Sequence, residues 1–197
     1  MKIAAIEVYG YELSYAHGTY AMSGDRVAQT QDSTLVRVVT TDGVEGWGEI
    51  STLGGTYLPA YAGGARAAVA EFGPALIGVD ATNLSAVNLA MNSVLIGYQY
   101  AKSAVDIACW DILGKATQMP IAALLGGVVQ VDFPVYEAVP LASPEAMAAF
   151  VRDRRAAGIN QFQLKVGNAP KDDVARVQAV VSAGGSDTLV NGDAKGG

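Results

Sequence analysis

The first fifty residues alternate between hydrophobic and polar positions with the period of two that is typical of β-strands. Residues 2–13 alternate, and so do the β-branched run at residues 34–40 and a third run at residues 44–50. The pair Asp42-Gly43 separates the last two runs, and an Asp-Gly pair in that position is a strong hairpin signal. The pattern therefore predicts a small antiparallel meander, interrupted by a loop at residues 17–25 that is rich in Gly, Ser and Thr.

The pattern changes after a second Gly-containing loop at residues 51–59. Apolar residues then recur at helical spacing over residues 61–77, 84–95 and 101–117, which predicts amphipathic helices that cover the meander. Strands followed by helices in this order are typical of an α+β unit. We therefore predict an α+β domain over residues 1–130.

From residue 131 onward, strand and helix patterns alternate. We predict strands and helices in turn over five segments: residues 131–140, 144–157, 162–166, 170–183 and 188–192. The order β-α-β-α-β indicates parallel strands with right-handed crossovers.

Such a segment fits half of a doubly wound sheet as well as the first three units of a (β/α)8 barrel. Lys165 ends the second predicted strand and Asp193 ends the third. Barrel enzymes carry their active sites at the carboxyl ends of the strands. Charged residues at two equivalent strand ends therefore favour the barrel and one shared site, although loops place charged residues in solvent in many proteins.

Composition narrows the class of protein. The chain has 197 residues, a formal net charge of −6, 51% hydrophobic residues and 16% charged residues. This balance excludes a disordered chain and argues against nucleic-acid binding. The chain has no apolar run long enough for a transmembrane helix, and its beginning lacks the features of a signal peptide, so we expect a cytoplasmic protein without a membrane partner. Cys109 is the only cysteine, which excludes an internal disulfide and a cysteine-based zinc site.

One stretch carries a specific family resemblance. Residues 101–127 read A-x-x-A-V-D-x-A-x-W-D, followed by G-K, a proline and L-L-G-G. This stretch resembles the signature of the mandelate racemase/muconate lactonizing enzyme branch of the enolase superfamily, and residues 42–49 (DGVEGWGE) resemble the capping domain of that family. The resemblance implies a capping domain at residues 1–130, followed at residues 131–197 by the first three βα units of an incomplete (β/α)8 barrel. The signature carboxylates Asp106 and Asp111 are expected to be structural.

The resemblance also assigns the chemistry. Lys165 matches the second lysine of the family's K-x-K motif, which is the usual catalytic base, and Gln163 replaces the first lysine. Asp193 matches the first Mg²⁺ ligand of a D-x-N motif in which Lys195 replaces the asparagine. Abstraction of a proton α to a carboxylate creates a dianion, whose charge Mg²⁺ offsets. The lysine must be neutral to act as a base, and we expect burial and a nearby dication to lower its pKa.

The capping loops are expected to supply the contacts to the substrate. Tyr20, Met22 and Tyr57 are the candidates there, together with Gln163 on the strand, whereas His17 is interpreted as a non-catalytic loop residue. A tyrosine face suits a cationic amino or imino acid. The Q-x-K strand and both loops resemble hydroxyproline-directed members of the family, which implies dehydration of cis-3-hydroxy-L-proline. The alternative is 2-epimerisation of 4-hydroxyproline betaine or proline betaine, and Gln163 makes muconate-type cycloisomerisation less favoured.

The length raises one further expectation. A complete barrel takes about 250 residues, so the part after residue 130 accounts for three of its eight strands. We expect this chain to be part of a longer enzyme that forms a homo-oligomer and acts on a small carboxylate. By itself it would hold one of three metal ligands and be inactive. The alternative to an enzyme is a non-enzymatic protein, in which this chain serves only as a binding or scaffold module.

Overall fold

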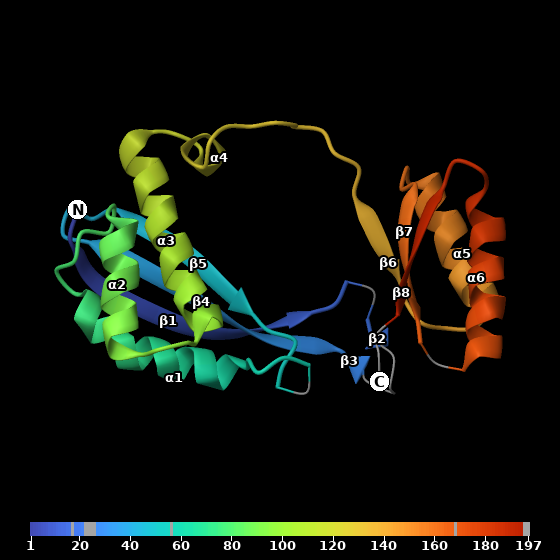
Figure 1. The fold of residues 1–197 in the computed structure, drawn as a ribbon, viewed down its shortest axis with the longest axis horizontal. Coiled ribbons are helices and arrows are strands. Elements are labelled where there is room, and N and C mark those ends of the chain that lie inside the picture. Colours follow the sequence, from blue (N-terminus) through green and yellow to red (C-terminus); the bar gives the residue numbers. More distant parts are fainter. Residues whose placement is uncertain (17, 22–26, 56, 168, 195–197) are drawn as a thin grey trace. The chain divides into compact units, whose positions relative to one another are not determined.

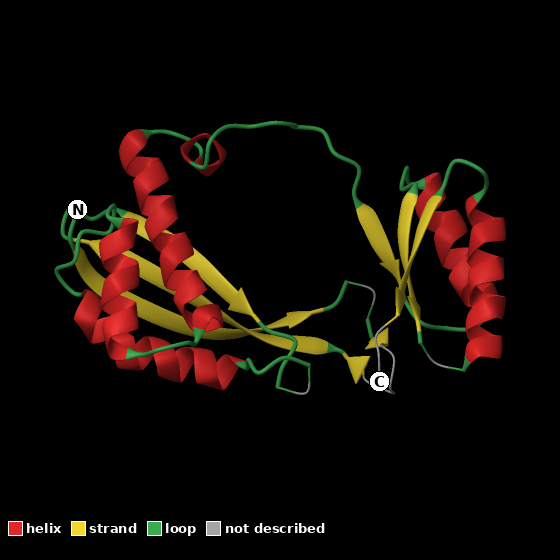
Figure 2. Cartoon of the chain, in the orientation of Figure 1, coloured by secondary structure: helices red, strands yellow, loops and turns green. Residues whose placement is uncertain are grey.

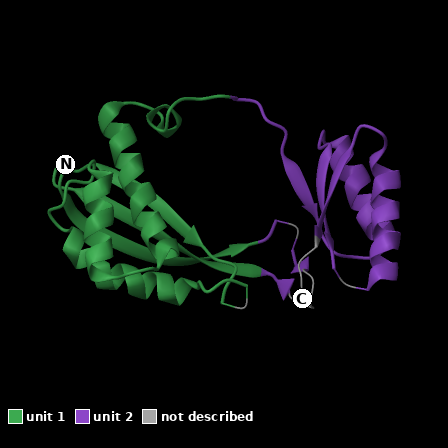
Figure 3. Cartoon of the chain, viewed as in Figure 1, with its two compact units in different colours: residues 1–14, 30–129 green, residues 15–29, 130–197 purple. Residues whose placement is uncertain are grey.

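The structure is a computed structural model that describes residues 1–16, 18–21, 27–55, 57–167 and 169–194. It divides into two compact units, each with its own hydrophobic core (Figure 3). The first unit consists of residues 1–14 and 30–129, and the second of residues 15–29 and 130–197. The segment 15–29, which the sequence pattern places within the meander, thus groups with the barrel-like part of the chain.

The first unit contains a sheet of three antiparallel strands, as predicted. The strands are β1 (Ile3–Ser14), β4 (Thr30–Thr40) and β5 (Glu45–Ser51), in the spatial order β1-β4-β5 (Figure 1). The predicted hairpin between β4 and β5 is confirmed, since Gly43 has φ +77° in the turn, a backbone conformation that favours glycine.

Helices cover one face of this sheet (Figure 2). Of the helices in this unit, α1 (Ala62–Phe72) and α3 (Gln99–Thr117) contact the sheet, α2 (Leu84–Val94) and the 3-10 turn η1 (Gly73–Leu76) pack beside them, and the short α4 (Ile121–Leu124) follows α3. The core lies between sheet and helices, and its fully buried side chains include Val36, Val38, Phe72, Met91 and Ile112.

Two glycines of β5 allow α3 to pack directly on the backbone of the sheet. A Cβ atom on Gly48 would lie 1.9 Å from the carbonyl oxygen of Ala104, and one on Gly46 would lie 2.0 Å from that of Ala108. Both distances are far below van der Waals contact, so only glycine fits at these positions. Alanines on α3 provide the matching small surface. The G-x-G spacing of residues 46–48 is therefore a packing requirement.

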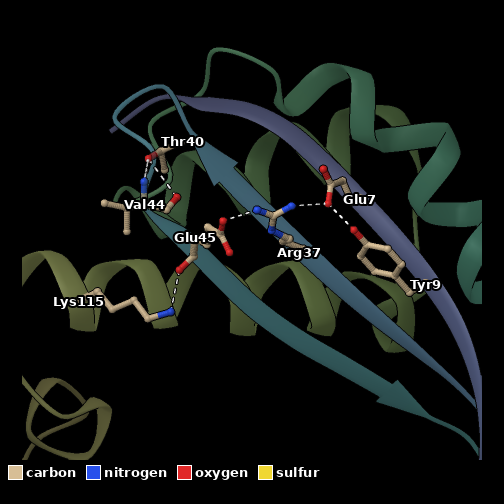
Figure 4. Close-up of polar contacts among 7 residues, drawn as sticks. All are labelled: Glu7, Tyr9, Arg37, Thr40, Val44, Glu45 and Lys115. Carbon is tan, nitrogen blue, oxygen red and sulfur yellow. Dashed lines mark hydrogen bonds and ion pairs between the residues drawn. The ribbon is translucent and has the colours of Figure 1, made fainter.

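The opposite face of the sheet carries an exposed chain of charges. Arg37 on β4 lies between Glu7 on β1 and Glu45 on β5 and forms an ion pair with each, at 2.7 Å from Nη1 to Glu7 Oε2 (Figure 4). The Arg37 guanidinium also lies 5.7 Å from the ring centre of Trp47. Lys115 of α3 donates a hydrogen bond of 2.7 Å to the carbonyl oxygen of Glu45. The two ion pairs of Arg37 link all three strands across their outer face, and the contact of Lys115 ties α3 to β5.

The second unit has the predicted β-α-β-α-β order with parallel strands. Its elements are β6 (Tyr136–Val139), α5 (Pro144–Ala156), β7 (Gln161–Val166), α6 (Pro170–Gly184) and β8 (Leu189–Ala194). The strands pair in the order β6-β7-β8 (Figure 1).

Two strand boundaries of this unit differ from the prediction by more than one residue. The first strand begins at Tyr136 rather than at residue 131, because Pro134 has no N–H to donate and the side chains around it are exposed. The third strand extends to Ala194, so Asp193 lies inside the ladder. The predicted N-cap of α5 is confirmed by a hydrogen bond of 3.3 Å from the Ala146 N–H to Ser143 Oγ.

Within the predicted loop at residues 17–25, two of the described residues form a short strand. Strand β2 (Tyr20–Ala21) pairs antiparallel with β3 (Val27–Ala28). At the base of this pair, the Tyr15 N–H donates to the Gln29 carbonyl oxygen at 3.3 Å. Within the part of the chain that the structure describes, no helix is long and apolar enough to cross a membrane.

Candidate active site at the carboxyl ends of β7 and β8

The candidate site is built by alternation along two neighbouring parallel strands. Phe162 and Leu164 of β7 are buried in the core against α5 and α6. Successive side chains of a strand point to opposite faces, so Gln163 and Lys165 lie on the face away from the helices. The register pairs Lys165 with Asp193 of β8. These two predicted residues are therefore brought together by the ladder, near the carboxyl ends of their strands.

Lys165 is tightly held by its neighbours. Its Nζ donates to Asp193 Oδ2 at 2.5 Å and to Gln163 Oε1 at 2.9 Å. The Lys165 side chain is 8% exposed, whereas that of Asp193 is 27% exposed. The amine is thus shielded from bulk water, while the carboxylate stays more accessible. Gln163 is a predicted substrate contact. In the structure its side-chain oxygen accepts the hydrogen bond from Lys165, and its contact with a substrate stays a prediction.

The residues around Lys165 raise its pKa. Burial lowers it, as predicted, but the hydrogen bond and charge of Asp193, together with Tyr20, raise it, and the net direction is upward. Burial is the largest single effect, but the effects of Asp193 and Tyr20 together favour the ammonium form more than burial disfavours it. Burial thus acts in the expected direction, and the expected further lowering by a nearby dication stays a prediction.

Tyr20, a predicted substrate contact, interacts with Lys165. Its side chain contributes both a hydrogen bond and a charge effect to the pKa of that lysine. The ring of Tyr15 stacks on that of Tyr20, with centroids 5.5 Å apart and planes at 16°. Sequence reasoning missed Tyr15, because two aromatic residues in an irregular loop carry no periodicity that would indicate contact.

The other candidates divide into two groups. Tyr57 belongs to the first unit, where its N–H donates to the Gly54 carbonyl oxygen at 3.0 Å, and its contact with a substrate stays a prediction. Met22, His17 and Lys195 lie outside the described residues.

The two signature carboxylates of α3 make structural contacts. Asp111 accepts the Trp47 N–H at 3.0 Å and pairs with Lys115 at 2.7 Å, while Asp106 accepts a hydrogen bond of 2.7 Å from Asn88. Asp111 therefore ties α3 to β5, and Asp106 ties it to α2.

One described residue of the site suits a divalent cation. Asp193 offers carboxylate oxygens of the kind that Mg²⁺ takes as ligands. Among the residues that the structure describes, no three His, Cys, Asp or Glu side chains gather closely enough to hold a metal. The site therefore fits Mg²⁺ in the type of its ligand, but it supplies one ligand only.

Comparison with models of protein families shows which family the chain belongs to. Residues 12–126 match the N-terminal domain of the mandelate racemase / muconate lactonizing enzyme family. The chain belongs to this family. The expected family, within the enolase superfamily, is confirmed, and so is the fold class of a capping domain followed by the strand-helix units of a partial barrel.

Curated members of the mandelate racemase / muconate lactonizing enzyme family align along nearly the whole chain. A cis-3-hydroxy-L-proline dehydratase of Roseibium aggregatum is 42% identical over 100% of this chain and 54% of its own length. An N-succinyl-L-Arg/Lys racemase of Bacillus cereus is 31% identical over 98% of this chain and 52% of its own length. The chain thus spans about half the length of the curated relatives it matches.

Solved structures of the family agree in fold. An enolase superfamily member from Roseovarius nubinhibens, complexed with magnesium, matches with a TM-score of 0.86 and 34% identity over 98% of this chain and 52% of that one. A dipeptide epimerase from Enterococcus faecalis, complexed with Mg and the dipeptide L-Leu-L-Tyr, matches with a TM-score of 0.91 and 28% identity over 98% of this chain and 54% of that one.

Proposed function

We propose that the complete enzyme removes the proton α to a carboxylate with the help of Mg²⁺, and that its reaction is the dehydration of cis-3-hydroxy-L-proline. The observation that carries this proposal is the position of Lys165, a buried amine beside Asp193 near the carboxyl end of a barrel strand. The 42% identity to a dehydratase for this substrate supports the choice of reaction.

In this reaction Lys165 acts as the base. The amine would become neutral once the charge of Asp193 is offset by Mg²⁺, because a cation beside the carboxylate removes its preference for the ammonium form. The lone pair of the neutral Nζ then accepts the proton from Cα, the electrons of the broken C–H bond form a Cα=Cβ double bond, and the C3–O bond breaks. The 3-hydroxyl group takes up a proton and leaves as water. Gln163 and Tyr20 hold the amine in place, since both interact with it in the structure.

Asp193 is the proposed Mg²⁺ ligand of this chain, and the remaining ligands lie outside the described residues. The bound ion would supply positive charge where the substrate carboxylate becomes more negative. We propose residues 1–130 as the capping domain and residues 131–197 as the start of the barrel, with Tyr20, Met22, Tyr57 and Gln163 as substrate-binding residues.

Epimerisation is the second candidate. A racemase and a dipeptide epimerase align with almost the whole chain, and both names describe inversion at a carbon without elimination. Lys165 would then exchange the α-proton of 4-hydroxyproline betaine or proline betaine with a second base on the other face of the carbon. The described residues serve both reactions equally.

The test uses the protein expressed from its complete reading frame, with MgCl2 and each substrate in deuterated water. Dehydration predicts loss of the hydroxyl group from cis-3-hydroxy-L-proline and a pyrroline product. Epimerisation predicts deuterium at Cα of the betaine without elimination. If neither a hydroxyproline nor a betaine reacts, both substrate assignments are wrong.

For the 197-residue chain alone we propose no turnover. The described residues place one carboxylate beside Lys165 and gather no cluster of three metal ligands. Assaying the isolated chain beside the protein from the complete reading frame tests this. Full turnover by a protein whose intact mass is 20.3 kDa would contradict the proposed site.

A further inference from the structure

The loop that follows Lys165 is held by a carboxylate at the start of α6. Gly167 comes two residues after Lys165 and has φ +110°. Its N–H donates to Asp173 Oδ2 at 2.9 Å. Asp173 lies in the first turn of α6 and is largely buried. The carboxylate of Asp173 therefore binds the backbone immediately after β7, the strand that carries the proposed base.

Arg176 extends this contact to the neighbouring strand end. Its Nη1 pairs with Asp173 Oδ1 at 3.1 Å, and its Nε donates to the carbonyl oxygen of Ala142 at 3.0 Å. Ala142 lies between β6 and α5, in the loop at the carboxyl end of β6. The ion pair thus links the loops that follow β6 and β7, which are neighbours in the sheet.

Both side chains are largely buried, with 12% of Asp173 and 18% of Arg176 exposed. Charge-assisted hydrogen bonds are stronger than neutral ones, and water competes little with a buried pair. The two residues act on backbone groups: the N–H of Gly167 and the carbonyl oxygen of Ala142. A contact of this kind fixes where a loop runs without touching a substrate.

We propose that Asp173 and Arg176 are positioning residues for the catalytic reaction. They fix the two loops at the barrel edge that carries Lys165, and so hold the amine at the distance that proton transfer needs. The inference rests on the proposed function of Lys165. A displacement of about 1 Å at a reacting group costs about 10²-fold in rate, so a loop held less firmly is expected to lower kcat.

The same unit offers a matched control at the other end of the strands. Arg155 near the end of α5 pairs with Asp187 at 2.8 Å and donates to Thr188 Oγ1 at 2.6 Å. These two partners lie just before β8 begins at Leu189, at its amino end. The control pair therefore also links a helix to a loop, but at the edge opposite to Lys165.

The experiment compares Asp173→Ala, Asp173→Asn and Asp187→Ala in the protein expressed from its complete reading frame. We measure kcat, KM, melting temperature and hydrogen exchange at the amide of residue 167. Asp173→Ala is expected to lower kcat about 10- to 100-fold, to leave KM nearly unchanged and to speed exchange at that amide. Asp173→Asn keeps an oxygen that accepts the Gly167 N–H, so it should restore slow exchange and part of kcat.

Asp187→Ala should lower the melting temperature and leave kcat within about 2-fold, because it loosens the edge away from the chemistry. Equal losses of kcat in Asp173→Ala and Asp187→Ala would show a merely structural role and overturn the inference. So would fast exchange at residue 167 in Asp173→Ala with normal kcat. If the unmodified enzyme turns over neither substrate class, the proposed function fails, and the positioning role in catalysis fails with it.

Discussion

The strands of this chain carry two clusters in which positive and negative side chains form ion pairs, and the clusters differ in their exposure to water. Arg37 crosses an antiparallel sheet between Glu7 and Glu45, with side chains that are 26%, 39% and 40% exposed. Lys165 lies beside Asp193 on parallel strands and is 8% exposed. Exposed ion pairs contribute little to stability because water and salt screen them. A buried lysine, in contrast, has a pKa that its surroundings shift readily, which suits a catalytic base.

The two clusters lie on different kinds of sheet face. In the first unit, the face that packs against helices is apolar, and its charges lie on the open face. In the second unit, Phe162 and Leu164 fill the core against the helices, and the other face of the same strand carries Lys165. A charge partly removed from water costs free energy, so its presence there is evidence for function.

The largest expected effect comes from removing the amine. Lys165→Met should lower kcat about 10³-fold, because general base catalysis contributes factors of that order. Lys165→Arg keeps the positive charge beside Asp193 but should be equally inactive, since arginine stays protonated. Steady-state turnover and deuterium exchange at Cα measure both losses. Arg37→Met is the control, and a similar loss of activity there would remove the distinction between the clusters.

The second prediction concerns packing in the first unit. Gly48→Ala places a Cβ atom 1.9 Å from the Ala104 carbonyl oxygen, and we expect it to lower the free energy of unfolding of this unit by about 3 kcal/mol. Urea denaturation followed by circular dichroism measures the change. Gly55→Ala is the control, because a Cβ atom at that position would have no atom of the described residues within 4 Å. Equal stability of the two variants would mean that α3 does not pack this closely.

A smaller effect is expected from the hydroxyl group of Tyr20. Tyr20→Phe removes its hydrogen bond to Lys165 and should lower kcat/KM about 10-fold, as the loss of a hydrogen bond to a charged group implies. Tyr136→Phe removes the hydroxyl of a tyrosine that is 58% exposed on β6 and should leave kcat/KM unchanged. Equal values for both variants would show that the contact of Tyr20 does not influence the base.

The smallest expected effect is the pH dependence of the exposed cluster. Hydrogen bonds from Tyr9 and Arg37 lower the pKa of Glu7, and one from Arg37 lowers the pKa of Glu45. A lowered pKa in the folded state means a stabilising contribution that is present above the unfolded value of about 4.3. This contribution is lost as the pH falls through the lower folded value.

The urea midpoint of the first unit should therefore fall between about pH 7 and pH 3, and it should fall less in Arg37→Met, in which the two pKa values return toward normal. Lys2→Met, which removes an exposed lysine at the edge of the same sheet, should keep the wild-type dependence. An unchanged acid dependence in Arg37→Met would mean that the cluster contributes nothing to stability.

The sequence determined the elements of this fold, because each depends on local patterns. Period-two alternation set the strands of the meander, the Asp42-Gly43 pair set their turn, and Ser143 set the start of α5; the structure confirms all three. The same pattern placed Lys165 and Asp193 at neighbouring strand ends. The first barrel strand was predicted too long, since hydrophobic residues around Pro134 imitate a strand that has no ladder to join.

Only the tertiary structure decided how the site is held. The register of β7 and β8 sets Lys165 against Asp193, and this contact, together with Tyr20, raises the pKa of the lysine. The contacts of Tyr20 with Lys165 and of Asp173 with Gly167 join groups whose meeting depends on the course of irregular loops. Periodicity records which face a residue occupies, while ion pairs and pKa values depend on distances between atoms that folding alone establishes.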